Sequence, residues 1–361
     1  MEGFIYPLFL ILATDLEHSI FQSNQPFVLE SGYRFPSYHL AYTTYGKMNS
    51  QKDNVVWIFQ ALTANSHPHE WWPGLVGEGK LFDPKKDFIV CVNMPGSCYG
   101  SIGPLEVNPE TGEKHFHDFP FFTTKDMIRS YQPLKDFLGI EKIKIGIGGS
   151  MGGQQLLEWA IAEPSLFEYI FPIATNARHS AWGIAFNASQ RFCIELDPTW
   201  KDKSPESGLE GMKAARSVAL LSYRHYETYH SSQSEKHNEK LENYKSESYQ
   251  KYQGEKLSRR FNAFSYYILS KSMDAHNVGR GHENIESALQ RIQSKTMAIG
   301  ISSDLLFPLS EQQFIAEHIP GARFESIDSL YGHDGFLLEY ERIEGLIRDL
   351  MKTNNEGSFC F

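Results

Sequence analysis

Residues 142–163 read KIKIGIGGSMGGQQLLEWAIAE, and this stretch decides the expected fold. Apolar residues alternate at Ile143, Ile145 and Ile147, as in a β-strand, and a helical segment follows Ser150 directly. The glycines two residues before and two residues after the serine remove Cβ atoms that would clash in a sharp turn between strand and helix. Such a turn presents a serine nucleophile at the mouth of a site, above a helix N-terminus that favours negative charge. The alternative is a glycine-rich turn in which the serine is incidental.

The order of elements along the chain predicts a mostly parallel sheet. Continuous apolar runs at 54–60 and 87–93 are typical of buried central strands. Further strands are expected at 26–31, 39–45, 142–149, 169–174, 295–301 and 323–328, and helices at 123–138, 153–163, 309–318 and 336–352. Strands that alternate with helices, together with a serine in this kind of turn, predict an α/β-hydrolase fold with a doubly wound sheet.

The segment 175–282 departs from this alternation. It is polar, rich in Tyr, Ser, Lys and Glu, and mostly helical in spacing. We therefore expect a helical lid inserted over the C-terminal edge of the sheet, where such folds place their sites. The core domain would then comprise 1–174 and 283–361. Within the lid, 229–248 has few apolar residues and is expected to be an exposed loop or a solvated helix.

Composition limits the classes of partner and compartment. The chain has 361 residues, of which 41% are apolar and 22% charged, as in globular proteins. Its formal net charge is −10, so it lacks the basic surface of a nucleic-acid-binding protein. The four cysteines are too sparse for a disulfide scaffold, which favours a cytoplasmic protein. The apolar segment 3–13 is too short to span a bilayer and has no positive flank, so no membrane association is expected; a weak export signal is the alternative.

Ser150 needs a base and an acid to act as a nucleophile. In this fold the chain order is serine, then acid, then histidine. Directly after the strand at 295–301 the sequence reads SSDLLFP, which places Asp304 as the acid. After the last strand it reads YGHDGF, which places His333 as the base. Asp304 has an alternative role as a turn or helix-capping residue.

An oxyanion hole requires two backbone N–H groups beside the nucleophile. One is expected from Met151, the residue after the serine, and the other from Leu62, in the loop after the strand at 54–60. The pairs His67/His69 and His115/His117 have the i, i+2 spacing of some metal ligands. No third ligand accompanies either pair, so no metal site is expected.

From about residue 26 to residue 350 the chain resembles the homoserine O-acetyltransferases, α/β-hydrolase-fold acyltransferases of methionine biosynthesis. Each block of the resemblance is weak alone, but together and in order they are highly specific. The blocks are ALT (61–63), NMPGSCYGSIGP (93–104), VNPETG (107–112), DFPFFTTKDM (118–127), GGSMGGQQLLEW (148–159), DPTW (197–200), LSYR (221–224), YQGEKLSRR (252–260), VGRG (278–281) and YGHDGFLLE (331–339).

This resemblance implies a two-step acyl transfer through an acyl-Ser150 intermediate, with His333 as base and then acid. It implies acetyl-CoA as the acyl donor, L-homoserine as the acceptor and no permanently bound cofactor. Arg216 would bind the homoserine carboxylate, because a planar guanidinium can hold it with two hydrogen bonds. Tyr223 would be a second contact, and Asp334 would bind the ammonium group. The family is commonly dimeric through its lid helices, so a homodimer is implied.

The sequence departs from the family pattern near the expected acyl-donor channel. Ala64 replaces a glycine, 95–97 reads PGS where leucine-glycine-glycine is usual, and Ile102 replaces a threonine. These changes leave the donor open between acetyl-CoA and succinyl-CoA. The acceptor is open between homoserine and serine, because serine O-acyltransferases share the scaffold. Two alternatives remain. One is a serine esterase with the same triad, distinguished by whether water reaches the acyl-enzyme. The other is a non-catalytic relative used for binding, against which the intact set of serine, aspartate and histidine argues.

Overall fold

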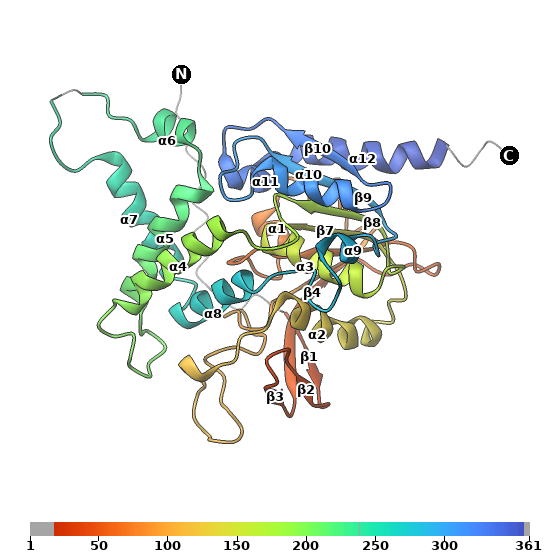
Figure 1. Ribbon diagram of the computed structural model, residues 1–361, viewed down its shortest axis with the longest axis horizontal. Helices are drawn as coiled ribbons and strands as arrows, with labels where there is room; N and C mark the ends of the chain where they lie inside the picture. Colours follow the sequence, from red (N-terminus) through yellow and green to blue (C-terminus); the bar gives the residue numbers. More distant parts are fainter. Residues whose placement is uncertain (1–17, 238, 357–361) are drawn as a thin grey trace.

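The computed structural model describes residues 18–237 and 239–356, so the apolar segment 3–13 lies outside the described residues. An eight-stranded sheet forms its centre, in the order β1-β4-β6-β5-β7-β8-β9-β10 (Figure 1). Every neighbouring pair from β6 to β10 is parallel, whereas β4 runs antiparallel to β6 and to β1. This is the mostly parallel sheet that the sequence predicts.

The strands of this sheet and of a small ribbon formed by β2 and β3 have the following bounds: β1 Ser19–Ser23, β2 Phe27–Val28, β3 Arg34–Phe35, β4 Tyr38–Tyr45, β5 Val55–Phe59, β6 Phe88–Val92, β7 Ile143–Gly149, β8 Phe167–Ile173, β9 Lys295–Ile301 and β10 Arg323–Ile327. The helices are α1 Pro68–Trp71, η1 Phe116–Asp118, α2 Thr124–Phe137, α3 Met151–Ala162, α4 Ala181–Glu195, α5 Leu209–Tyr223, α6 Tyr226–Gln233, α7 Lys245–Ser258, α8 Ala263–Asp274, α9 Ile285–Leu289, α10 Leu309–His318, η2 Gly332–Asp334, α11 Gly335–Leu338 and α12 Tyr340–Glu356.

Strand β5 shows why the sheet is covered on both faces. All five of its residues are buried, and alternate side chains enter different apolar cores. Trp57 packs beneath α2 and α3, where its ring meets that of Trp159 at 4.8 Å between centroids. Val56 and Ile58 point to the opposite face, which α1, α11 and α12 cover. Burial of each large side chain contributes about 1.5–3 kcal/mol, so the continuous apolar run fixes β5 at the centre of the sheet.

Helices α4 to α8 form a separate group beside the sheet (Figure 1). The chain leaves the core after β8 and returns before α9, and the two crossing segments are paired. His179 N donates to His276 O at 3.0 Å, and Val278 N donates to Ala177 O at 2.9 Å. In the segment 229–248, α6 ends at Gln233 and α7 begins at Lys245, and the described residues between them are mostly exposed.

Two local differences from the sequence prediction have clear causes. The helix expected at 336–352 is two helices, because the chain leaves the helical conformation at Glu339, whose φ and ψ are −86° and 48°. Strand β1 was not predicted, since it is an exposed edge strand with one buried residue, Ser23, and carries little apolar signal. Among the described helices, none is both long and apolar enough to cross a membrane. The cysteines Cys91, Cys98 and Cys193 are free thiols.

Candidate active site

Ser150 stands at the junction of β7 and α3 in a strained backbone conformation, with φ 56° and ψ −127°. Its N–H donates to Ile173 O at 3.0 Å, which continues the ladder between β7 and β8. A Cβ atom at Gly148 would lie 2.5 Å from the backbone of Gly152, and one at Gly152 would lie 2.3 Å from Phe59 O. The glycines around the serine are therefore required by the close approach of strand and helix, as the motif predicts.

Asp304 and His333 meet at the same edge of the sheet, after β9 and β10 respectively. His333 Nδ1 lies 2.7 Å from Asp304 Oδ2, and both side chains are buried. The other carboxylate oxygen, Oδ1, accepts hydrogen bonds from the N–H groups of Leu306 at 2.8 Å and Phe307 at 2.9 Å. With both oxygens engaged, the carboxylate has one orientation, and it selects the imidazole tautomer that carries its proton on Nδ1.

Three aromatic rings surround the imidazole of His333. The ring centroids of Phe307, Phe336 and Tyr223 lie 5.1, 5.2 and 5.7 Å from it. Phe336 also reaches the nucleophile strand, since a Cβ atom at Gly149 would lie 2.2 Å from its ring. Phe336 thus packs between the end of β7 and the histidine.

In the described part of the chain, the His333 imidazole forms a hydrogen bond with Asp304. Ser150 Oγ and the imidazole do not form one. Catalytic contacts of this kind are often long without substrate and shorten in the reacting complex. The structure therefore joins the acid to the base and brings the serine to the same edge. Direct contact between serine and base stays a prediction.

The residues expected to form the oxyanion hole lie on adjoining elements. Met151 begins α3, and Leu62 lies in the loop after β5, where Ala64 N donates to Ala61 O at 3.0 Å to close a turn. The start of α3 touches the end of β5 through the close contact of Gly152 with Phe59 described above. The turn at Ser150 and the loop after β5 are thus neighbours. That the N–H groups of Met151 and Leu62 form an oxyanion hole stays a prediction.

The residues expected to bind the acceptor lie beside the imidazole. The Arg216 guanidinium on α5 lies 5.3 Å from the centre of the Tyr223 ring, and that ring contacts His333. Desolvation raises the pKa of the Tyr223 hydroxyl, so this group stays protonated and can donate a hydrogen bond. The Arg216 guanidinium and the Tyr223 hydroxyl therefore lie on the side of His333 where we expect the acceptor.

Asp334 has a charged partner that the sequence interpretation missed. Its Oδ2 lies 2.9 Å from Arg224 Nε, although the N–H is not aligned for a hydrogen bond. Partial desolvation and the nearby charges of Arg260, Arg216 and Arg224 lower the pKa of the Lys256 ammonium group on α7. These basic groups lie on α5, on α7 and in the loops after them. Arg216 and Arg224 bring positive charge next to Tyr223 and Asp334, which adjoin His333. The only signal in the sequence was the SYR block, in which Arg224 follows Tyr223 directly.

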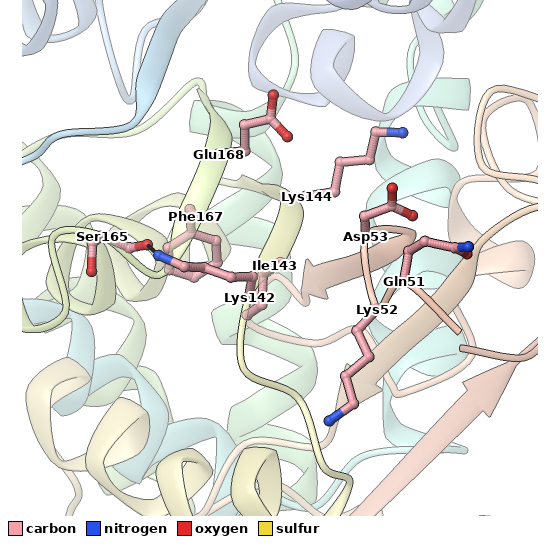
Figure 2. Close-up of a pocket in the computed structure, with 9 residues that line it drawn as sticks. All are labelled: Gln51, Lys52, Asp53, Lys142, Ile143, Lys144, Ser165, Phe167 and Glu168. Carbon is pink, nitrogen blue, oxygen red and sulfur yellow. Dashed lines mark hydrogen bonds between the residues drawn. The ribbon is translucent and has the colours of Figure 1, made fainter. Parts of the chain in front are cut away.

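The cavity in Figure 2 does not belong to this site. Its volume is about 380 Å³, and it is lined by Gln51, Lys52, Asp53, Lys142, Ile143, Lys144, Ser165, Phe167 and Glu168. These residues precede or begin β5, β7 and β8, whereas Ser150 follows the other end of β7. Seven strand residues at about 3.3 Å each separate the two ends. Among the described residues, no three His, Cys, Asp or Glu side chains are grouped to hold a metal ion.

Several known proteins resemble this chain in sequence or in fold. A family model described as alpha/beta hydrolase fold matches residues 54–340. A protein named homoserine O-acetyltransferase from Cyclobacterium marinum is 46% identical over 344 residues, covering 95% of this chain and 98% of that protein. One of the same name from Chlorobaculum parvum is 42% identical over 328 residues, covering 90% and 92%. The crystal structure of homoserine O-acetyltransferase from Bacillus anthracis shares the fold with a TM-score of 0.85 at 24% identity, covering 92% of this chain and 97% of that chain.

Proposed function

Because the chain belongs to the homoserine O-acetyltransferase family of α/β-hydrolase-fold proteins, we propose that it transfers the acetyl group of acetyl-CoA to the side-chain hydroxyl of L-homoserine. The observation that carries the proposal is the buried hydrogen bond between His333 and Asp304, at the sheet edge where the strained Ser150 follows β7. The proposed product, O-acetyl-L-homoserine, would serve methionine biosynthesis. No permanently bound cofactor takes part.

In the first half-reaction, His333 removes the proton of Ser150, and Ser150 Oγ attacks the thioester carbonyl of acetyl-CoA. The N–H groups of Met151 and Leu62 stabilise the oxygen anion of the tetrahedral intermediate. The C–S bond then breaks, the imidazolium returns the proton to the CoA sulfur, and acetyl-Ser150 remains. Asp304 stays ionised throughout, and it stabilises the imidazolium that forms beside it.

In the second half-reaction, His333 removes the proton of the homoserine hydroxyl, whose oxygen attacks acetyl-Ser150. The bond between the acetyl carbonyl carbon and Ser150 Oγ breaks, and Ser150 Oγ recovers the proton from His333. Arg216 would hold the homoserine carboxylate, with Tyr223 as a second contact. The Asp334 carboxylate would bind the ammonium group. One of its oxygens, Oδ2, lies against Arg224. These contacts orient the acceptor hydroxyl toward the acyl-enzyme.

We also propose that the helical segment 175–282 acts as a lid that limits the access of water to the acyl-enzyme, which favours transfer over hydrolysis. Large apolar side chains on α4 support a homodimer formed through this lid. Trp182 and Phe192 on α4 and Leu196 directly after it are 56%, 59% and 82% exposed, and a contact between two lids would bury them. The negative net charge and the three free thiols support a cytoplasmic protein without a nucleic-acid partner.

One assay tests the donor and the acceptor together. The purified protein is mixed with homoserine or serine, each with acetyl-CoA or succinyl-CoA, and free CoA is followed over time. Beyond the single equivalent released when Ser150 is acylated, we expect sustained CoA release only with acetyl-CoA and homoserine, together with O-acetylhomoserine in equal amount. Sustained release that is independent of the amino acid would identify a hydrolase, and preference for succinyl-CoA or serine would reassign the substrate.

Replacing Arg216 with lysine is expected to raise the KM for homoserine about 30-fold. A lysine cannot reproduce the two parallel hydrogen bonds of a guanidinium to a carboxylate, a loss of about 2 kcal/mol. Cleavage of the thioester in the first half-reaction should change less than twofold, as measured by single-turnover CoA release. The exposed Arg259 provides the matched control, R259K, which should leave both steps unchanged. Equal losses in both half-reactions for R216K would show that Arg216 supports the fold instead.

A further inference from the structure

A second strained residue stands beside the nucleophile. Ala174 has φ 44° and directly follows β8, next to Ser150, which has φ 56° and directly follows β7. Neither is a glycine, so both conformations must be held by the surrounding contacts. Ala174 N donates to Ile299 O at 2.8 Å, which anchors it to β9. The residue that follows, Thr175, is fully buried.

The Thr175 side chain turns back onto the nucleophile. Its hydroxyl donates a hydrogen bond to the Ser150 carbonyl oxygen at 2.8 Å. The same oxygen accepts the first helical hydrogen bonds of α3, from Gly153 N at 3.0 Å and Gln154 N at 3.2 Å. Thr175 thus adds a donor from outside the helix and fixes the direction of this carbonyl. A Cβ atom at Gly153 would lie 2.6 Å from Thr175 Cγ2, so the glycine leaves room for the threonine.

The backbone of Thr175 leads to the catalytic acid. Its carbonyl oxygen accepts a hydrogen bond at 2.6 Å from Nε2 of Gln312, a fully buried residue of α10. The same Nε2 lies 3.5 Å from Phe307 O. Phe307 N in turn donates to Asp304 Oδ1 at 2.9 Å. A continuous buried path of polar contacts therefore runs from the Ser150 backbone to the carboxylate of Asp304.

We propose that Thr175 and Gln312 are positioning residues, which hold the Ser150 backbone at a fixed place relative to Asp304 and hence to His333. The proposal rests on the proposed function, in which Ser150 forms the acyl-enzyme. Since the serine hydroxyl and the imidazole do not share a hydrogen bond in this structure, their alignment depends on the backbone that carries each. A displacement of about 1 Å at such a site can cost about a hundredfold in rate.

The test measures acylation of Ser150 by p-nitrophenyl acetate in a stopped-flow instrument, with the acyl-enzyme identified by mass spectrometry. T175V has nearly the same shape but no hydroxyl, and we expect it to acylate about tenfold more slowly. T175S keeps the hydroxyl and should restore at least half of the rate. The KM for homoserine should stay within twofold, because neither residue contacts the acceptor groups.

A second pair of variants tests the other contact. Q312M removes the amide donor and should also slow acylation several-fold, whereas Q313M, at the exposed neighbouring glutamine, should not. Full acylation rates in folded T175V and Q312M would overturn the inference alone. A wild-type protein that is not acylated at Ser150 would overturn the proposed function, and the inference with it. If neither T175V nor Q312M folds, then Thr175 and Gln312 stabilise the fold and do not position Ser150, and the inference is overturned.

Discussion

Replacing Ser150 with alanine is expected to abolish acyl transfer, with a loss of at least about 10⁴-fold in kcat. The proposed reaction proceeds through an ester on Ser150 Oγ, and alanine offers no atom to form it. The fold should survive, because the strained conformation is held by backbone contacts that alanine retains, including those to Ile173 O and from Thr175. Product formation from acetyl-CoA and homoserine measures the loss.

Mass spectrometry adds a direct reading of the covalent step. Wild-type protein mixed with acetyl-CoA in the absence of homoserine should gain one acetyl group on the peptide that contains Ser150, and S150A should gain none. Ser189 is an exposed serine on α4 whose hydroxyl donates to Ala185 O, so S189A is the matched control and should behave as wild type. Substantial turnover by folded S150A would rule out the acyl-enzyme.

Replacing Asp304 with asparagine is expected to lower kcat about 10⁴-fold while leaving the protein folded. The N–H groups of Leu306 and Phe307 both point at Oδ1, so the asparagine oxygen must occupy that position. Its NH₂ group then faces His333 Nδ1 and donates to it. The imidazole is forced to carry its proton on Nε2, and it can no longer accept the proton of Ser150.

Single-turnover acylation, measured as CoA release, should show this loss already in the first half-reaction. The exposed Asp328 follows β10 and accepts a hydrogen bond from Ser302, so D328N is a matched control outside the triad. We expect D328N to stay within twofold of wild type. An activity of D304N within tenfold of wild type would mean that another acid orients His333.

Much of the architecture could be predicted from the sequence because its signals are local. The apolar run of β5 and the alternation before Ser150 each describe one strand, and the glycines around the serine describe one turn. Asp304 and His333 could be placed because they directly follow strands in a fold whose chain order is known. The edge strand β1 could not be predicted, since its residues face solvent and carry no pattern of burial.

The missed features of the site are contacts between segments far apart in the chain. The pairing of Arg224 with Asp334 joins residues 110 positions apart, and neither residue alone differs from an ordinary surface charge. The same holds for Thr175, whose hydroxyl acquires a role only through the carbonyl of Ser150, 25 residues earlier. Such roles depend on tertiary packing, which a single sequence does not display.

The ion pair between Arg224 and Asp334 has a consequence for selectivity. The Asp334 carboxylate has Arg224 as a counter-ion, which weakens its attraction for a lone cation. In the proposed binding mode a zwitterion would enter by exchange, giving its ammonium group to Asp334 while its carboxylate compensates the guanidinium groups of Arg224 and Arg216. A neutral alcohol would bring no replacement charge, and a simple amine would leave the arginines uncompensated. The site would thus prefer zwitterionic acceptors, because only these keep every charged group of the site paired when they bind.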